Sequence, residues 1–447
     1  MNIHKTEGDV NLSDLRRAWQ REHLHEETFA LLERDAGVFL HQALSTPCLN
    51  ALKSSEGIYL TDVEGRRYMD FHGNNVHQLG YGHPAVVEAM KTQLDQMSFS
   101  PRRYTNETAI RYAEKLISLA PKGLTRLLFA PGGSLAMGMA LKLARIATGR
   151  HKTISAWESF HGASLDAISL GGTIDFRHGM GPLLSGTEHV PPPEEYTCLW
   201  GCHDRGGCDL KCAAYIEYIL EREGDIAAVV LESVRSTPSF PTKAFWQRVR
   251  QACDRHGALL ILDEIPYALG RTGKMFACEH YDLLPDMLVL GKGLGGGIMP
   301  LAALLAKEEL NVAAEKSIGH YTHEKNPLAC VAGLATLEYL EASHLLDHVN
   351  SLGEHAMKRL LEMKTRFSLI GDVRGKGLML GIELTKDPIS KEKASLEAEK
   401  VMYRALSRGL SFKLTRGNVI TLMPPLIINK VELDEALNII EGCLAEL

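Results

Sequence analysis

Four short apolar runs without alternation constrain the fold of this chain more than any other feature. They are separated by helical patterns and read "RLLFA" (126–130), "DIAAVVLE" (225–232), "GALLILDE" (257–264) and "DMLVLG" (286–291). A strand that is apolar at every position is covered on both faces, which is typical of a mainly parallel sheet flanked by helices. The sequence therefore predicts an α/β core from about residue 80 to about residue 340.

The two ends of the chain predict a smaller lobe. "GIYLTDVEGRRYMDF" alternates like an antiparallel hairpin with Glu64 and Gly65 at its turn, and "VRGKGLMLGIEL" offers one further strand in the C-terminal part. We expect residues 1–80 to form the N-terminal segment of the small lobe, 81–339 the large ligand-binding domain and 340–447 the C-terminal small domain.

Composition and charge narrow the class of ligand. The 447 residues carry a formal charge of -6, and the basic residues are scattered, so nothing favours nucleic acid as a partner. The N-terminal segment is polar and lacks the apolar stretch of a signal peptide. No run approaches the roughly 18 apolar residues that span a bilayer. We expect a cytoplasmic protein with a small-molecule ligand and no membrane contact.

A cluster of cysteines lies in "CLWGCHDRGGCDLKC", within a stretch rich in proline and glycine from about 179 to 212 that we expect to be a long excursion from the core. Zinc sites usually use tighter C-x2-C or C-x4-C pairs, so this spacing is an imperfect match. A bound metal and a surface insertion with free or redox-labile thiols both stay open; the second is favoured, and no metal ligand is predicted. The residues concerned are Cys198, Cys202, Cys208 and Cys212, with His203 beside them.

Two charged residues follow buried strands at the place where open α/β sheets bind ligands, just beyond the carboxyl ends. Lys292 follows "DMLVLG" and precedes a run of glycines; in a desolvated pocket a lysine can act as an amine nucleophile or a general base. Asp263 ends "LLILD", where a buried carboxylate needs a partner such as a protonated ring nitrogen. Asp263 alone is equally compatible with a helix cap or a salt bridge, and a lysine taken alone is more often a solvated surface residue.

Two further signals accompany this pair. Gly132, Gly133 and Ser134 join "RLLFA" to a helix, where backbone amides and the helix N-terminus can hold a phosphate. Phe160 and His161 follow the strand "TISAW", and an aromatic side chain there can stack on a flat cofactor. Each signal also has a more common explanation. A phenylalanine is more often a core residue, and glycines between a strand and a helix more often form a plain turn. A phosphate cradle, a stacking aromatic, a carboxylate for a ring nitrogen and a lysine amine are together what pyridoxal phosphate requires.

The order and spacing of these motifs resemble the class III aminotransferases of the fold type I pyridoxal phosphate enzymes. The matching signatures run from about residue 45 onward and are "DVEGRRYMDF", "GHP", "DEIPYALGRTGKMFA", "GKGLGGGIMP", "NPLAC" and "VRGKGLMLGIEL". The resemblance implies a large domain with a mainly parallel seven-stranded sheet and a smaller α+β lobe built from both chain ends. It also implies pyridoxal 5'-phosphate as cofactor and a homodimer with the active site at the subunit interface.

The same resemblance assigns roles to individual residues. Lys292 would hold the cofactor covalently and later move protons, and Asp263 would keep the pyridine nitrogen protonated. The other cofactor-binding positions would be Gly133 and Ser134 at the phosphate, Thr322 reaching the phosphate from the partner subunit, Phe160 and Ile265 on the two ring faces, His161 beside Phe160, and Glu232 near the phenolic edge of the ring.

Several positions depart from the family pattern. Thr421 stands before "PPL", where members that bind α-amino acids commonly carry an arginine for the substrate carboxylate, and Thr237 stands where ornithine-type members carry a glutamate that masks it. Pro266 replaces the usual glutamine, while Leu135 and Met137 replace the glutamate and asparagine of "SGSEAN". These departures argue against an ordinary aminotransferase cycle on an α-amino acid.

The substrate class is suggested by relatives in the family that are lyases of 2-aminoethyl compounds bearing a phosphate or phosphonate. "DFHGNNVHQLGYGHP" and the cysteine-bearing insertion resemble members that eliminate from (R)-1-hydroxy-2-aminoethylphosphonate, giving phosphonoacetaldehyde and ammonia. We expect this activity. The alternative is an ω-aminotransferase that acts on 2-aminoethylphosphonate or a similar amine with pyruvate as acceptor. A noncatalytic binding role is disfavoured by the presence of both Lys292 and Asp263.

A dianionic phosphonate needs cationic or amide partners, and the sequence offers several. Arg102 precedes Arg103 in "SFSPRRYTNE", and Lys413 lies near the Thr421 turn. We place Asn75 and Arg103 slightly ahead of the rest, because Asn75 lies on a loop that lines the substrate side in the family. The predicted substrate-binding set is Asn75, Arg103, Arg235 and Arg416.

Overall fold

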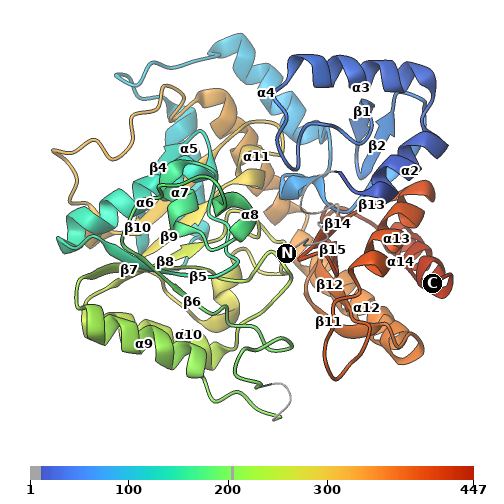
Figure 1. Cartoon of the computed structure of the whole chain (residues 1–447). Helices are drawn as coiled ribbons and strands as arrows, with labels where there is room; N and C mark the ends of the chain where they lie inside the picture. The colour runs from blue at the N-terminus through green and yellow to red at the C-terminus, as the bar shows by residue number, and fades with distance from the viewer. Residues whose placement is uncertain (1–11, 203–205) are drawn as a thin grey trace. The chain divides into compact units, whose positions relative to one another are not determined.

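The computed structural model describes residues 12–202 and 206–447 (Figure 1). It divides into two compact units. The central unit comprises Pro84–Arg235 and Ser239–His344, and the terminal unit comprises the chain up to His83, Ser236–Pro238 and Leu345–Leu447. These divisions lie a few residues beyond the expected boundaries at residues 80 and 339, and the short Ser236–Pro238 segment groups with the two chain ends.

The central unit is built on a seven-stranded sheet in the order β4-β10-β9-β8-β7-β5-β6. Strand β10 is antiparallel to both of its neighbours, while β9, β8, β7, β5 and β6 run parallel to one another. The predicted mainly parallel seven-stranded sheet is therefore confirmed. The strands are β4 (Leu124–Ala130), β5 (Lys152–Ala156), β6 (Thr187–Val190), β7 (Ile226–Glu232), β8 (Leu259–Asp263), β9 (Met287–Leu290) and β10 (Ala302–Lys307).

The four apolar runs form strands as predicted, but one of them is not covered on both faces. Strands β7 and β9 are buried at every position. In β4, which contains "RLLFA", Arg126 is exposed and Leu128 is 40% exposed. Strand β4 is the outermost strand of the sheet, and an edge strand can leave part of its surface uncovered. An apolar run thus identified the strand without revealing its position in the sheet.

Strand β6 corrects a second expectation, because it lies inside the stretch from 179 to 212 that was expected to leave the core. It pairs in parallel with β5, from Thr153 opposite Thr187 to Ala156 opposite Val190. Its sequence "TEHV" is largely polar, and a strand at the sheet edge needs no continuous apolar pattern. Between β6 and the next helix, the described residues form no further helix or strand.

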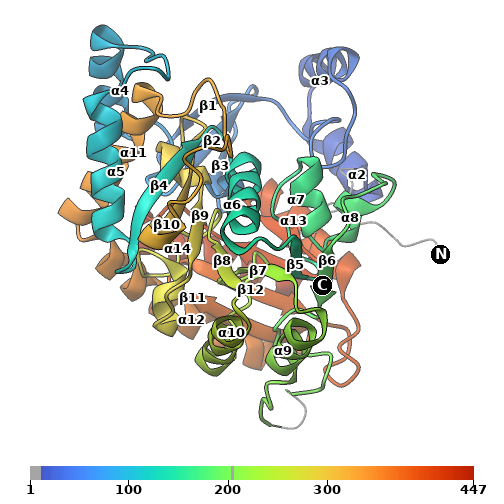
Figure 2. The same cartoon turned by 90° about the vertical axis from the view of Figure 1, so that its left-hand side faces the viewer.

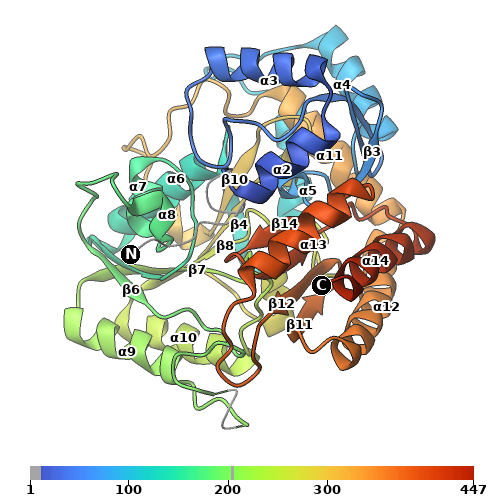
Figure 3. The same cartoon turned by 45° about the vertical axis from the view of Figure 1, so that its right-hand side comes forward.

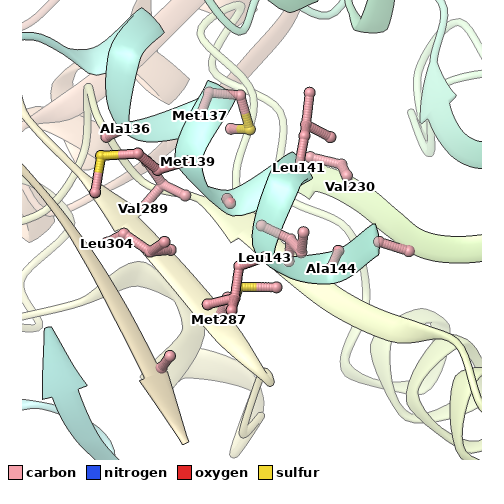
Figure 4. Packing of buried hydrophobic residues seen from close by; sticks show 14 of the residues in the cluster. Ala136, Met137, Met139, Leu141, Leu143, Ala144, Val230, Met287, Val289 and Leu304 are labelled. Atoms are coloured by element: carbon pink, nitrogen blue, oxygen red, sulfur yellow. The ribbon is translucent and has the colours of Figure 1, made fainter. Parts of the chain in front are cut away.

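Helix α6 (Gly133–Thr148) packs on one face of the sheet (Figures 2 and 4). Its buried side chains, among them Met139, meet Val289 of β9 and Leu304 of β10 in one apolar cluster. Burial of each large apolar side chain stabilises the fold by about 1.5–3 kcal/mol, so this cluster fixes the start of α6 just beyond the end of β4. Met137, at a position where the family pattern has asparagine, is fully buried in the same cluster.

Helices α9 (Lys211–Glu223) and α10 (Lys243–His256) lie on the opposite face of the sheet from α6 (Figures 1 and 2). Both end at a glycine in the left-handed conformation, Gly224 and Gly257, which is a common way for a helix to stop. The remaining helices of the central unit are α4 (Pro84–Gln96), α5 (Glu107–Leu119), α7 (Leu165–Leu170), α8 (Ile174–Arg177) and α11 (Pro327–Ala342).

The described residues of the terminal unit form two four-stranded sheets. The first contains the predicted hairpin, in which β2 and β3 turn at Gly65 with φ +87°, and its order is β1-β2-β3-β13. The second has the order β11-β12-β15-β14. The strands are β1 (Leu52–Glu56), β2 (Tyr59–Asp62), β3 (Arg67–Asp70), β11 (Ile370–Lys376), β12 (Met379–Leu384), β13 (Leu410–Ser411), β14 (Lys413–Thr415) and β15 (Val419–Leu422).

The segment "VRGKGLMLGIEL", expected to be a single strand, belongs to two. Strands β11 and β12 pair antiparallel with Lys376 opposite Met379, and Gly377 at φ +54° reverses the chain between them. Glycine adopts this left-handed conformation without a steric penalty, so the motif is a hairpin turn. Helix α12 packs on β11 and β12 and lies beside α14 (Figure 3). The helices of this unit are α2 (Asp14–His23), α3 (Glu26–Val38), α12 (Leu345–Arg366), α13 (Ser395–Ser407) and α14 (Lys430–Ala445).

Candidate active site

Three of the predicted site residues follow or end neighbouring strands of the central sheet. Glu232 ends β7 and Asp263 ends β8, and the two residues are direct partners in the parallel register. Lys292 comes two residues after β9, with φ +50°, and begins the short turn Lys292–Gly295. Because the carboxyl ends of parallel strands meet at one edge of a sheet, the fold brings two carboxylates and an amine to the same edge. A positive φ at a lysine is sterically uncommon and is typical of functional positions.

Asp263 is held by a histidine. His161 Nδ1 lies 2.7 Å from Asp263 Oδ2, and both side chains are buried. The other carboxylate oxygen accepts a hydrogen bond from the backbone N–H of Ile265 at 3.0 Å. His161 Nε2 lies 3.2 Å from Ser155 Oγ, which fixes the far side of the imidazole ring. The Asp263 carboxylate is thus oriented on both oxygens in a dry environment, as a carboxylate that holds a protonated ring nitrogen must be.

Glu232 is a second buried carboxylate at this edge. Tyr267 donates a hydrogen bond from its hydroxyl to Glu232 Oε1 at 3.1 Å. Burial raises the pKa of Glu232, while the positive charges of Arg235 and His161 oppose that rise. Tyr267 was not among the residues predicted for the site, although it stands only four positions after Asp263.

The start of α6 has the shape of a phosphate cradle. Among the described residues no side chain caps this helix at Gly132, so its first backbone N–H groups have no side-chain acceptor there. A Cβ added at Gly133 would lie 2.8 Å from Ile265 Cδ1, so any larger residue at this position would require the Ile265 side chain to shift. Ser134 Oγ accepts a hydrogen bond from the backbone N–H of Ala163 at 3.1 Å. An uncapped helix N-terminus beside a hydroxyl suits a phosphate, and with Asp263 and Lys292 the residues fit pyridoxal phosphate.

The residues predicted to contact the two ring faces, Ile265 and Phe160, and the residue predicted to reach the phosphate from the partner subunit, Thr322, differ in burial. Ile265 packs partly against the core cluster under α6. Phe160 is 40% exposed, and its ring contacts that of Phe176 with centroids 4.5 Å apart. Thr322 is exposed on the loop between β10 and α11. Phe160 and Thr322 therefore present free surface in a single copy of the chain.

The four predicted substrate-binding residues are distributed over both units. Asn75 is buried in the terminal unit with φ +60°, and its Oδ1 has no hydrogen-bond partner among the residues that the structure describes. Arg416, also in the terminal unit, has φ +55°. Arg103 is exposed on the loop before α5. Arg235 is buried three residues beyond Glu232 and forms an ion pair with Glu194. Of the four, the structure brings Arg235 to the strand edge that holds Glu232.

The positions that depart from the family pattern are accommodated within the fold. Thr421 Oγ1 lies 2.9 Å from Thr415 Oγ1, so two strands of the terminal unit share this hydroxyl pair. Thr237 is buried, and its Oγ1 finds no hydrogen-bond partner within residues 12–202 and 206–447. Neither hydroxyl can form the forked pair that an arginine makes with a carboxylate.

The cysteine-bearing segment runs from Cys198 to Cys212, into the start of α9. Within the described ranges, no three or more histidine, cysteine, aspartate or glutamate side chains are arranged to hold a metal ion. The four clustered cysteines are thiols. Burial raises the pKa of Cys212 to about 12, and nearby thiols add to that shift. His203, which the sequence places beside them, lies outside the described residues.

Within the described residues no helix is long and apolar enough to cross a membrane.

Comparison with known proteins identifies relatives along the whole chain. The family model for class III aminotransferases matches residues 41–444. The chain is 49% identical to (R)-1-hydroxy-2-aminoethylphosphonate ammonia-lyase of Vibrio splendidus, over 99% of this chain and 95% of that protein. It is 36% identical to the leucine/methionine racemase of Thermococcus litoralis, over 93% of this chain and 95% of that protein. A transaminase structure from Virgibacillus superposes with a TM-score of 0.85 at 28% identity, covering 93% of this chain and 98% of that one.

Proposed function

The chain belongs to the class III aminotransferase family, and on this basis we propose that it is a pyridoxal phosphate-dependent ammonia-lyase that converts (R)-1-hydroxy-2-aminoethylphosphonate to phosphonoacetaldehyde and ammonia. The observation that carries the proposal is the 49% identity, along 99% of the chain, with the Vibrio splendidus protein of that name. The site supports it independently, because Thr421 and Thr237 leave no forked partner for the carboxylate of an α-amino acid at those positions.

The residues at the strand edge would hold the cofactor in a defined way. Lys292 would carry it, Asp263 would hold a proton at the ring nitrogen, and Gly133 with Ser134 would bind the phosphate through the first turn of α6. When bound, pyridoxal phosphate withdraws electrons from the carbon next to the substrate nitrogen. The His161 imidazole keeps the Asp263 carboxylate turned toward that task.

The reaction requires two proton movements and the loss of one hydroxide. Lys292, as an amine, would remove a proton from the carbon that bears nitrogen, and as an ammonium it would protonate the departing hydroxyl to give water. The product then leaves as an enamine, which tautomerises to an imine and takes up that water to release ammonia and phosphonoacetaldehyde. The atoms balance without an oxidant and without a second keto substrate.

Glu232 and Tyr267 would serve the phenolic edge of the ring. Pro266 has no side-chain donor, whereas Tyr267 donates to Glu232 and keeps this carboxylate in place. Since burial raises the pKa of Glu232, this side chain can carry a proton toward the phenolic oxygen. We assign it a positioning role beside the cofactor.

We also propose that two copies of the chain form the active unit in the cytoplasm. Thr322 would reach the cofactor phosphate of the partner subunit, which agrees with its exposure in one copy. Phe160, exposed beside the site, would be covered by the cofactor and the partner. Sedimentation equilibrium should give twice the mass of the chain, and Thr322→Ala should weaken cofactor binding.

The test of the reaction is product formation without an acceptor. The holoenzyme is incubated with the hydroxylated aminophosphonate, and ammonia and aldehyde are measured with and without pyruvate. We expect equal amounts of both products and no dependence on pyruvate. A strict requirement for pyruvate would instead identify an ω-aminotransferase, the alternative that the transaminase relatives of this fold favour. The Lys292→Ala variant is the control for cofactor-dependent chemistry.

A further inference from the structure

Arg235 has an unusual environment for an arginine. Its side chain is 3% exposed and contacts the carboxylates of Glu158, Glu194 and Glu232. Nη1 forms an ion pair with Glu194, Nη2 donates to the backbone carbonyl of Glu158 at 2.9 Å, and Nε lies 3.9 Å from Glu232 Oε2. Nε makes no hydrogen bond to any described residue. An arginine fork that is buried and incompletely bonded retains the capacity to bind a further anion.

The main partner of this arginine comes from a segment without regular structure. Glu194 lies in "PPPEEY", between β6 and the cysteine cluster, and its side chain is 7% exposed. Its Oε2 accepts a hydrogen bond from Thr197 Oγ1 at 2.9 Å, a contact within the same segment. Glu232, by contrast, is fixed at the end of a central strand. Of these two carboxylates, Glu194 is therefore the one whose backbone can move without disturbing the sheet.

A dianionic substrate changes the charge balance around Arg235. One cation already faces Glu158, Glu194 and Glu232, so a phosphonate that arrived while all three stayed in place would meet net repulsion. Departure of the Glu194 carboxylate reduces this repulsion and frees Nη1 of Arg235. Because desolvation offsets the attraction within a buried ion pair, separating Glu194 from Arg235 costs less than the charge attraction alone would suggest when the phosphonate takes its place.

We infer that Arg235 binds the phosphonate of the substrate and that Glu194 occupies the same side of the guanidinium group until substrate arrives. Glu194 is thus a built-in competitor that keeps Arg235 ordered and solvent-excluded in the absence of substrate. This inference rests on the proposed function for the nature of the anion. Arg235 is suited to the role because it lies three residues beyond Glu232, whose register partner Asp263 marks the cofactor site.

Binding of methylphosphonate to the holoenzyme tests this inference without turnover. Calorimetric titration compares the wild type with Glu194→Gln, Arg235→Gln and the double variant, and Glu195→Gln is the matched control because it is adjacent and exposed. Glu194→Gln should bind methylphosphonate about tenfold more tightly, since the competing charge is gone. Glu195→Gln should stay within about twofold of the wild type, and both variants that lack Arg235 should bind at least about tenfold more weakly.

Several results would overturn the inference. One is that Glu194→Gln and Glu195→Gln bind methylphosphonate with equal affinity. Another is that Arg235→Gln binds it as tightly as the wild type. If Glu194→Gln does not fold, the double variant, which removes both partners of the Arg235–Glu194 pair, decides: wild-type affinity there contradicts the role of Arg235, and loss of binding supports it. If Glu194→Gln binds methylphosphonate more tightly but the wild type releases no ammonia, the proposed reaction is contradicted and this inference is supported. If the wild type releases ammonia but Glu194→Gln binds methylphosphonate no more tightly, the inference is contradicted and the proposed reaction is supported.

Discussion

Two buried pairs of ionisable side chains in the central unit differ in how completely they are hydrogen-bonded, namely His161 with Asp263 and Arg235 with Glu194. In the first, His161 and Asp263 are both satisfied, and each belongs to a strand end or to the loop directly after one. In the second, Arg235 is paired with Glu194 from an irregular segment, and its Nε has no hydrogen-bond partner in the described part of the chain. Both pairs are nearly inaccessible to solvent. We call His161–Asp263 the fixed pair and Arg235–Glu194 the openable pair, since we infer that substrate displaces Glu194. Burial alone does not distinguish the two pairs, and the completeness of their hydrogen bonding does.

The largest expected effect concerns the fixed pair. Asp263→Asn should lower kcat by about 10³-fold, because an amide does not stabilise a proton on the ring nitrogen as a carboxylate does. Steady-state ammonia release measures the loss, and the exposed Asp282→Asn is the control. A tenfold loss or less would mean that the carboxylate at the end of β8 is not central to the chemistry.

The next effect separates orientation from chemistry. His161→Ala should lower the free energy of unfolding of the holoenzyme by about 3 kcal/mol, since it leaves a buried carboxylate without its imidazole partner. Denaturant unfolding measures this change. His151→Ala, at an exposed histidine, should stay within about 0.5 kcal/mol of the wild type. Equal stability of the two variants would show that the His161–Asp263 pair is no more fixed than the surface.

A smaller effect tests the close approach at the start of α6. Gly133→Ala should weaken pyridoxal phosphate binding by about tenfold, because the added Cβ would press on Ile265 Cδ1. Fluorescence titration of the apoprotein with the cofactor gives the affinity. Gly37→Ala, where an added Cβ meets no described atom within 4 Å, should leave it unchanged. Unchanged affinity in Gly133→Ala would place the phosphate elsewhere.

The smallest effect is the pH dependence of stability at Glu232. Its folded-state pKa lies above the ordinary value for glutamate, so its contribution to stability is present at low pH and is lost as pH rises through the raised pKa. Glu232→Gln removes this titration. The stability of the variant relative to the wild type should therefore increase as pH rises above about 4.5. A constant difference across that range would contradict a raised pKa.

The sequence allowed the fold and the location of Asp263 to be predicted because both depend on local pattern, whereas the contact of Asp263 with His161 was not predicted. Apolar runs that end in Glu232 and Asp263 identify buried parallel strands, and the edge where they end follows from topology. The hairpin with Gly65 at its turn was predicted for the same reason. Strand β6 was missed and β4 was expected to be fully covered, because a strand's position in the sheet depends on its neighbours rather than on its own residues.

The second pair could not be predicted in the same way. Arg235 was a candidate because of its distance from Glu232 along the chain, but "PPPEEY" carries no periodicity that would place Glu194 against it. Tyr267 was missed because its bond to Glu232 joins side chains that follow different strands. The segment "VRGKGLMLGIEL" was read as one strand because the reversal at Gly377 is a matter of backbone conformation. Contacts between segments distant in sequence were the common cause of these omissions.

The most direct test of the central claim is a comparison of kcat and KM for the hydroxylated aminophosphonate in Asp263→Asn and Glu194→Gln. The fixed pair serves the chemistry, so Asp263→Asn should lose kcat by about 10³-fold with a much smaller change in KM. The openable pair serves binding, so Glu194→Gln should lower KM by about tenfold, with the larger part of its effect in KM. A loss of kcat in Glu194→Gln as large as that in Asp263→Asn would contradict this division of roles.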